Sequence, residues 1–255
     1  PSLIQLITSY FFDQPVHLNS FYIRKTDSIM QFWTAAYVEG PRLTKSDVYV
    51  LTSSNTFSGA EEFTYNLKNL KRATIIGETT GGGAHPVDIR AFRNLSVVMR
   101  LPYGRAINPI TGTNWEGTGV KPDIEVPRDK AYDVAYSKAL KGLLDKTTDP
   151  DKKGALVWMS EKQEAILNPV TIGLDTLKQY AGTYADRVIT LENGELYYQR
   201  QGRPKFRLIP MNATTFMLDG LDSFRLQFVR DASGNVSEVI GMYDIGQNDR
   251  SPRNR

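Results

Sequence analysis

The sequence predicts an α/β fold for its first half and a small antiparallel β domain for its last third. An apolar segment at 48–52, an amphipathic segment at 59–70 and a second apolar segment at 73–77 follow one another closely. That order is typical of a βαβ unit with a right-handed crossover. After Tyr180 the chain becomes a series of short segments rich in β-branched and aromatic residues, separated by turn residues.

The elements before the βαβ unit are a helix and a hairpin. Residues 1–12 carry apolar residues at helical spacing, and residues 18–24 and 29–36 read as two strands around a short polar turn. The segment 48–52 is continuously apolar, which predicts a strand that is buried on both faces.

Beyond the βαβ unit, three glycines at 81–83 break the chain. A strand is expected over 92–101 and a long polar loop over 102–118. Helices are expected over 129–146 and 161–167. The resulting domain limits are 1–127, a helical segment and linker at 128–172, and an all-β domain at 173–255.

The C-terminal domain should be a small antiparallel sheet or barrel. Asn193-Gly194 and Ser233-Gly234-Asn235 are strong hairpin signals. The basic tail at 249–255 is expected to be a frayed end. Strands are expected at 188–191, 196–199, 206–210, 215–218, 225–229 and 236–243. The expected core is Tyr180, Tyr184, Tyr197, Tyr198, Phe206, Phe216 and Phe224, with a ligand pocket lined by them as the alternative.

Composition excludes several kinds of chemistry. The chain has 255 residues, 40% of them apolar and 23% charged, with a net charge of +3 and no long basic cluster, so nucleic acid is not an expected partner. It has no cysteine, and its only histidines are His17 and His85, so thiolate catalysis and a multi-histidine metal site are excluded. No apolar run approaches the roughly 20 residues that span a bilayer. The chain starts as if inside a helix, which predicts an N-terminal truncation.

Ser58 is the main candidate for chemistry, because it lies between the predicted strand at 48–52 and the predicted helix at 59–70. The free N–H groups and positive dipole end of a helix N-terminus stabilise a developing oxyanion beside such a serine. The alternative is an ordinary helix N-cap, a position that serine favours. The glycines at 81–83 lack the Lys-Ser/Thr of a phosphate-binding P-loop and favour a tight turn beside the site.

Three motifs in the right order resemble the tail-specific, or C-terminal-processing, serine peptidase family. They are TFSGAE at 56–61, RATIIGETTGGG at 72–83 and NWEGTGVKPDI at 114–124. The resemblance is greatest to the branch of tricorn protease and the interphotoreceptor retinoid-binding protein, and it covers roughly residues 1–127. It implies a crotonase-like (ClpP-like) catalytic domain, cleavage of protein substrates near their C-termini, no cofactor, and a periplasmic, secreted or cell-envelope location. It leaves the oligomeric state open.

The resemblance assigns roles residue by residue. Ser58 matches the nucleophile, Gly59 the residue whose N–H forms half of the oxyanion hole, and Glu116 the glutamate of a Ser–His–Glu set. The lysine base of another branch is replaced by Gly83. The branch's histidine and its second oxyanion segment would lie upstream of Pro1. The resemblance assigns substrate binding to Gly81, Gly82 and Gly83.

Two questions stay open from the sequence. His85 follows the glycines closely; it is either the base, a substrate ligand, or a surface histidine in a glycine-rich turn. The retinoid-binding branch also leaves a rival function, a non-catalytic carrier of retinoids or fatty acids. In a third interpretation, the chain is an inactive fragment of an active enzyme.

Overall fold

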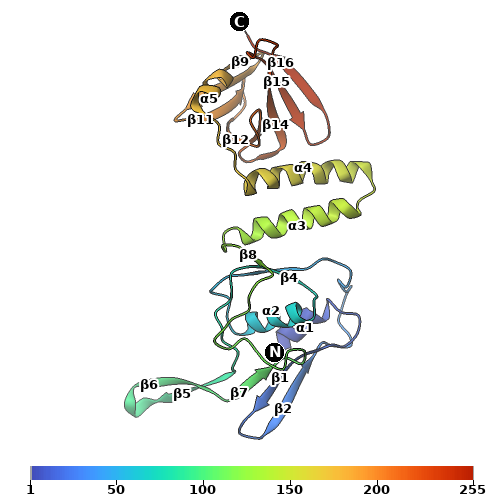
Figure 1. The fold of residues 1–255 in the computed structure, drawn as a ribbon, viewed down its shortest axis with the longest axis vertical. Coiled ribbons are helices and arrows are strands. Elements are labelled where there is room, and N and C mark those ends of the chain that lie inside the picture. The colour runs from blue at the N-terminus through green and yellow to red at the C-terminus, as the bar shows by residue number, and fades with distance from the viewer. Residues whose placement is uncertain (1, 255) are drawn as a thin grey trace. The chain divides into compact units, whose positions relative to one another are not determined.

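The structure is a computed structural model that describes residues 2–254. The chain divides into two compact units, Pro1–Ala135 and Tyr136–Arg255, called here the N-terminal unit and the barrel unit (Figure 1). The α/β class of the chain and its C-terminal antiparallel sheet are confirmed. The predicted domain limits at 127 and 172 stay predictions, as does the crotonase-like description.

The three-stranded antiparallel sheet of the N-terminal unit has the order β2-β1-β7. The predicted hairpin is confirmed, because β1 and β2 pair with Phe21 opposite Met30. Phe21 packs with Ala106 and Trp115 in a small core. The elements involved are α1 (Ser2–Ser9), β1 (His17–Ile23), β2 (Ser28–Trp33) and β7 (Gly104–Ile107).

The predicted βαβ unit is present, with a parallel pair of strands. It comprises β3 (Tyr49–Thr52), α2 (Gly59–Asn69) and β4 (Thr74–Gly77), and the short strand β8 (Ile124–Glu125) adds to β4. The expectation that 48–52 is buried on both faces is wrong. Because β3 lies at an edge of this three-stranded sheet, Leu51 is 43% exposed.

The segment expected as one strand over 92–101 is instead a hairpin. It consists of β5 (Val87–Phe92), a 3₁₀ turn (Arg93–Leu95) and β6 (Val97–Pro102), with Phe92 opposite Val97. The chain reverses at Ser96, whose φ of 51° is left-handed. The hairpin extends away from the rest of the unit (Figure 1), and its apolar side chains are largely exposed. The expected loop at 102–118 was also too long, because it contains β7.

Helix α3 (Ala131–Lys146) begins in the N-terminal unit, where Ala131 and Ala135 pack on Ile76. Helix α4 (Pro150–Leu167) starts 11 residues before the expected position, 161 − 150. Its start is fixed by the Asp149 side chain, which accepts hydrogen bonds from the N–H groups of Asp151 and Lys152. The missed part of α4 combines a polar first turn with the continuous apolar run 155–159, so it shows no helical periodicity.

The barrel unit is an eight-stranded antiparallel meander in which each strand pairs with the next. A bridge between Tyr184 and Arg253 links the first strand to the segment after the last strand and nearly closes the sheet. Asn193 and Gly194 both have positive φ, as a two-residue hairpin turn requires. The strands are β9 (Gly182–Tyr184), β10 (Arg187–Glu192), β11 (Glu195–Arg200), β12 (Lys205–Pro210), β13 (Thr215–Leu218), β14 (Leu221–Arg230), β15 (Val236–Tyr243) and β16 (Asn248–Pro252).

Two expectations about this unit are wrong. The basic tail is not frayed, because Asn248–Pro252 pairs with β15 and the Arg253 side chain donates to the carbonyl oxygens of Gln179 and Ala181. Tyr197 is not in the core. It faces outward, where its ring lies under the ammonium group of Lys205. Helix α5 (Leu174–Tyr180) and the core residue Phe228 were missed.

Candidate active site

Ser58 lies at the end of the turn that joins β3 to α2, at the N-cap position of the helix. Its φ of 56° and ψ of −119° fall outside the regions that a residue with a Cβ adopts without strain. Such strain costs about 1–3 kcal/mol and is found most often at functional sites. Ser58 and Gly59 are both exposed, so the hydroxyl is presented to solvent beside the first N–H groups of α2.

The turn before Ser58 is held by a carboxylate from outside it. Glu78 follows β4, and its side chain accepts hydrogen bonds from the N–H groups of Ser54 and Arg128 at 2.9 and 3.2 Å. These backbone hydrogen bonds lower the pKa of Glu78. Within the turn, the N–H of Ser53 donates to Thr56 Oγ1 at 3.0 Å. The turn that precedes Ser58 is therefore anchored to the segment that follows β4.

Glu61 is the polar centre of the site, with 0% of its surface exposed. Oε2 accepts from the N–H groups of Ser58 at 2.9 Å and Gly83 at 2.8 Å. Oε1 accepts from the N–H of Gly82 at 2.6 Å and from Thr80 Oγ1 at 2.5 Å. One buried carboxylate thus joins the serine turn to the glycine segment, and its desolvation is offset by four hydrogen bonds.

The glycine segment 81–83 packs directly against the serine turn. The N–H of Gly81 donates to the Thr56 carbonyl oxygen at 2.9 Å. A Cβ added to Gly83 would lie 2.1 Å from Cζ of Phe57, so no side chain fits there unless Phe57 moves. On the other side, Trp115 Nε1 donates to the Gly83 carbonyl oxygen at 3.1 Å.

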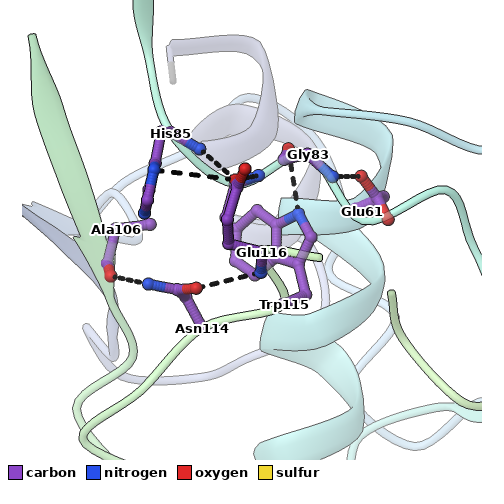
Figure 2. Close-up of polar contacts among 8 residues, drawn as sticks. Glu61, Gly83, His85, Ala106, Asn114, Trp115 and Glu116 are labelled. Carbon is purple, nitrogen blue, oxygen red and sulfur yellow. Dashed lines mark hydrogen bonds and ion pairs between the residues drawn. The ribbon is translucent and has the colours of Figure 1, made fainter. Parts of the chain in front are cut away.

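Glu116 holds the chain that follows the glycines. Its Oε2 accepts from the N–H groups of Ala84 at 2.7 Å and His85 at 3.1 Å, and lies 3.8 Å from Nδ1 of the His85 ring. Asn114 accepts the Glu116 N–H through Oδ1 at 2.9 Å and donates to the Ala106 carbonyl oxygen at 2.7 Å. Figure 2 shows the segment running between Glu61 on one side and Glu116 with His85 on the other.

The predicted residues form two adjoining groups. Ser58, Gly82 and Gly83 meet around Glu61, Gly81 bonds to the serine turn, and His85 meets Glu116. No hydrogen bond among the described residues joins Ser58 to His85. The other histidine, His17, is stacked on Trp33 with ring centroids 4.7 Å apart and lies within 2.9 Å of Ser20 Oγ, which indicates a packing role.

Sequence reasoning gave no role to Glu61. A signal was present, because Ser58 and Glu61 have the Ser-x-x-Glu spacing of a capping box. That spacing predicts the hydrogen bond from the Ser58 N–H. The hydrogen bonds from Thr80, Gly82 and Gly83 depend on long-range packing and have no local signal.

Within residues 2–254 no group of three acidic or histidine side chains could hold a metal ion. No helix of the same range is long and apolar enough to cross a membrane.

Comparison with known proteins gives one family and several structures. Residues 6–126 match the family described as peptidase family S41. The photosystem II D1 C-terminal processing protease is 20% identical, with a TM-score of 0.39 over 49% of this chain and 31% of that one. A candidate peptidase from Parabacteroides merdae is 19% identical, with a TM-score of 0.45 over 54% and 47%. A candidate S41 protease from Bacteroides fragilis is 20% identical, with a TM-score of 0.42 over 51% and 35%. The chain spans less than half the length of each.

Proposed function

Because residues 6–126 match peptidase family S41, we propose that the protein is a serine endopeptidase in which Ser58 is the nucleophile. The observation that carries the proposal is the conformation of Ser58. It is strained, exposed and located between a parallel strand and a helix N-terminus. A strained strand-to-helix turn also presents the nucleophile in the α/β-hydrolases, by analogy of geometry rather than of fold.

The proposed reaction is acyl transfer. Ser58 Oγ attacks the carbonyl carbon of the scissile peptide bond while a base takes its proton, and the C–N bond then breaks as the leaving amine receives a proton. The acyl-enzyme ester is hydrolysed by water in the second half of the reaction. The Gly59 N–H stabilises the oxyanion, and a donor of this kind is worth about 2.7–4 kcal/mol in comparable hydrolases.

Glu116 is proposed to orient the base. A carboxylate that accepts from an imidazole N–H fixes the tautomer and stabilises the charged ring. His85 is one candidate for the base, supported by the 3.8 Å between its Nδ1 and Glu116 Oε2. The other is a histidine from an upstream segment, as the family resemblance implies. The lysine base of the other branch is absent, because position 83 is glycine and Phe57 occupies the space that a Cβ there would need.

The glycine segment is proposed to lie beside the bound substrate backbone. The N–H groups of Gly82 and Gly83 donate hydrogen bonds to Glu61, so these groups position the segment and do not face the substrate. The segment's role is therefore to leave room beside Ser58 for an extended peptide. Cleavage near the C-termini of proteins, and a cell-envelope location, are the substrate class and compartment that we propose from the family.

Labelling of the full-length protein with a fluorophosphonate tests the nucleophile. We expect label on Ser58 in the wild type, none in Ser58→Ala, and unchanged labelling in the matched control Ser54→Ala, which alters an exposed serine of the same turn. Labelling that persists in Ser58→Ala would refute the assignment.

The same assay separates the two candidates for the base. If His85 is the base, His85→Ala should lower the labelling rate by 10²-fold or more, as general-base catalysis contributes about 10²–10⁴-fold. If the base is an upstream histidine, His85→Ala should label almost normally, while Glu116→Gln should still be slow. Normal labelling in Glu116→Gln would contradict its role with either base.

A further inference from the structure

The interior of the barrel is filled at one end. At the end covered by α5, Tyr180 stacks on Phe228 with ring centroids 4.1 Å apart, and Phe216 packs edge-on against both rings. The Tyr180 hydroxyl donates to the Ala213 carbonyl oxygen at 2.8 Å, which ties α5 to the loop between β12 and β13.

The opposite end of the barrel holds a cavity of about 340 Å³. Tyr198 and Phe224 belong to the buried core, and Phe206, Leu221 and Tyr243 pack against it, so the cavity borders the core of the barrel. The cavity is lined by Tyr198, Arg200, Arg203, Pro204, Phe206, Leu221, Ser223, Phe224 and Tyr243. Eight-stranded barrels have an interior wide enough for side chains alone or for one small ligand.

A buried arginine lies behind two walls of this cavity. Arg187 has 0% of its surface exposed, and its guanidinium carbon lies 5.6 Å from the centroid of the Phe224 ring. Its Nη2 donates to both carboxylate oxygens of Asp249 at 2.5 and 2.6 Å. Asp249 also accepts from the Tyr243 hydroxyl at 3.1 Å. The ion pair is thus in contact with one cavity wall and within cation–π distance of another.

The remaining donors of Arg187 are not used by the fold. Nε and Nη1 are buried and have no hydrogen-bond partner among the described residues. Buried N–H groups are nearly always paired in folded proteins. The Arg187–Asp249 ion pair fits because Gly241 has no side chain. A Cβ there would lie 2.3 Å from Asp249 Oδ1 and 2.9 Å from Arg187 Nη1. The barrel therefore holds a guanidinium with free hydrogen-bonding capacity next to an aromatic cavity.

We propose that this end of the barrel binds a small carboxylate with an apolar or aromatic body, whose head group accepts hydrogen bonds from Arg187. The body of the ligand packs on Tyr198, Phe206 and Phe224. Entry of the head group requires a side-chain shift of Phe224 or Tyr243, which separate Arg187 from the cavity.

Charge and size define the ligand class. The rim adds Arg200, which pairs with Asp186 at 2.5 Å, and the exposed Arg203. The three arginines are Arg187, Arg200 and Arg203, and their charge exceeds that of Asp249 and Asp186 by one. This positive charge favours an anion as the ligand. At roughly 30 Å³ per water-sized atom, the cavity volume of about 340 Å³ suits a ligand of about a dozen non-hydrogen atoms. The site is independent of the proposed peptidase function, because it lies wholly in the barrel unit.

Calorimetric titration of the whole chain with 4-phenylbutyrate tests the proposal, with 4-phenylbutanamide as the neutral probe of the same size. We expect the acid to bind at least tenfold more tightly than the amide. Backbone amide chemical shifts should change in the strands that line the cavity and not in the N-terminal unit. Equal affinity for the two probes, or no binding of the acid at millimolar concentration, would overturn the proposal.

Two variants keep the test independent of misfolding. Arg187→Met with Asp249→Leu replaces the whole pair by apolar residues, an exchange that proteins often tolerate, and should abolish the preference for the acid. Ser223→Trp fills the cavity from an exposed position and should block both probes while leaving the thermal unfolding of the barrel unchanged. A preference for the acid that survives in the first variant, or full binding in the second, would refute the site.

Discussion

The two units bury charged side chains in different ways. In the N-terminal unit, Glu61 accepts hydrogen bonds from residues of the serine turn and the glycine segment, so one carboxylate holds two loops together. In the barrel unit the sheet nearly closes on itself around aromatic rings, and the buried Arg187 pairs with Asp249, whose side chain is 40% exposed. The candidate active site therefore depends on a polar network, whereas the barrel depends on apolar packing.

The largest expected effect tests the apolar side of this comparison. Phe228→Ala removes a ring that is 2% exposed and contacts Tyr180, Tyr184 and Phe216. Truncation of a buried Phe costs about 3–5 kcal/mol. We expect a loss of that size in the free energy of unfolding of the barrel unit, measured by urea denaturation with near-UV circular dichroism.

The control is Tyr197→Ala, because Tyr197 lies on the outer face of the barrel. It should cost less than about 1 kcal/mol. If Phe228→Ala also accelerates hydrogen exchange of the Gly82 and Gly83 amides, the two units are energetically coupled and the comparison fails.

The next effect tests the polar side. Glu61→Gln keeps the shape of the side chain but places an NH₂ group against N–H and O–H donors, so at least one buried donor loses its acceptor. Each unpaired buried donor costs about 1–3 kcal/mol. We expect a loss of about 2–3 kcal/mol from the N-terminal unit, with faster hydrogen exchange at Gly82 and Gly83.

The matched control is Glu125→Gln, which changes an exposed glutamate of the same unit and should stay within about 0.5 kcal/mol of wild type. Unchanged exchange at Gly82 and Gly83 in Glu61→Gln would show that backbone packing, and not the carboxylate, positions the glycine segment.

The sequence predicted the elements whose signals are local. The βαβ unit, the Asn193-Gly194 turn and strands 215–218 and 236–243 were predicted from periodicity and turn chemistry. The errors concern features that tertiary contacts determine, such as the exposure of a residue or the pairing of a strand. The exposed face of Leu51 follows from its edge position, and the order of the tail follows from pairing of β16 with β15.

The site was predicted in the same partial way. The motifs singled out Ser58, Gly59 and Glu116, because the resemblance assigns to each matching position the role of the family residue. They gave no distance between Ser58 and His85 and no role to Glu61, since three of the four donors to Glu61 lie 19 to 22 positions away in the sequence. Such contacts depend on how the loops pack after the strands have paired.

A smaller effect tests the packing of the glycine segment. Gly83→Ala places a Cβ 2.1 Å from Cζ of Phe57, so the ring must move. Overpacking of this kind costs about 1–3 kcal/mol. We expect the loss in unfolding free energy to be largely recovered in the double variant Gly83→Ala with Phe57→Ala, because Phe57 is exposed and its removal leaves room. A strictly additive double variant would contradict the contact with the Phe57 ring as the cause of the loss.

The smallest effect distinguishes Glu61 from its neighbour Glu62. Glu62 is also buried, and burial raises its pKa. A raised pKa means that the folded protein favours the neutral acid. The stabilising contribution is therefore complete below the unfolded pKa of about 4.3 and is lost as pH rises through the folded value. Glu62→Gln, which is neutral at every pH, should gain stability relative to wild type between pH 4 and pH 7, as measured by urea denaturation at both values. Glu61→Gln should instead be destabilised at pH 7, so the two substitutions should have opposite signs there. The same sign for both would mean that the four hydrogen bonds of Glu61 do not set it apart from an ordinary buried acid.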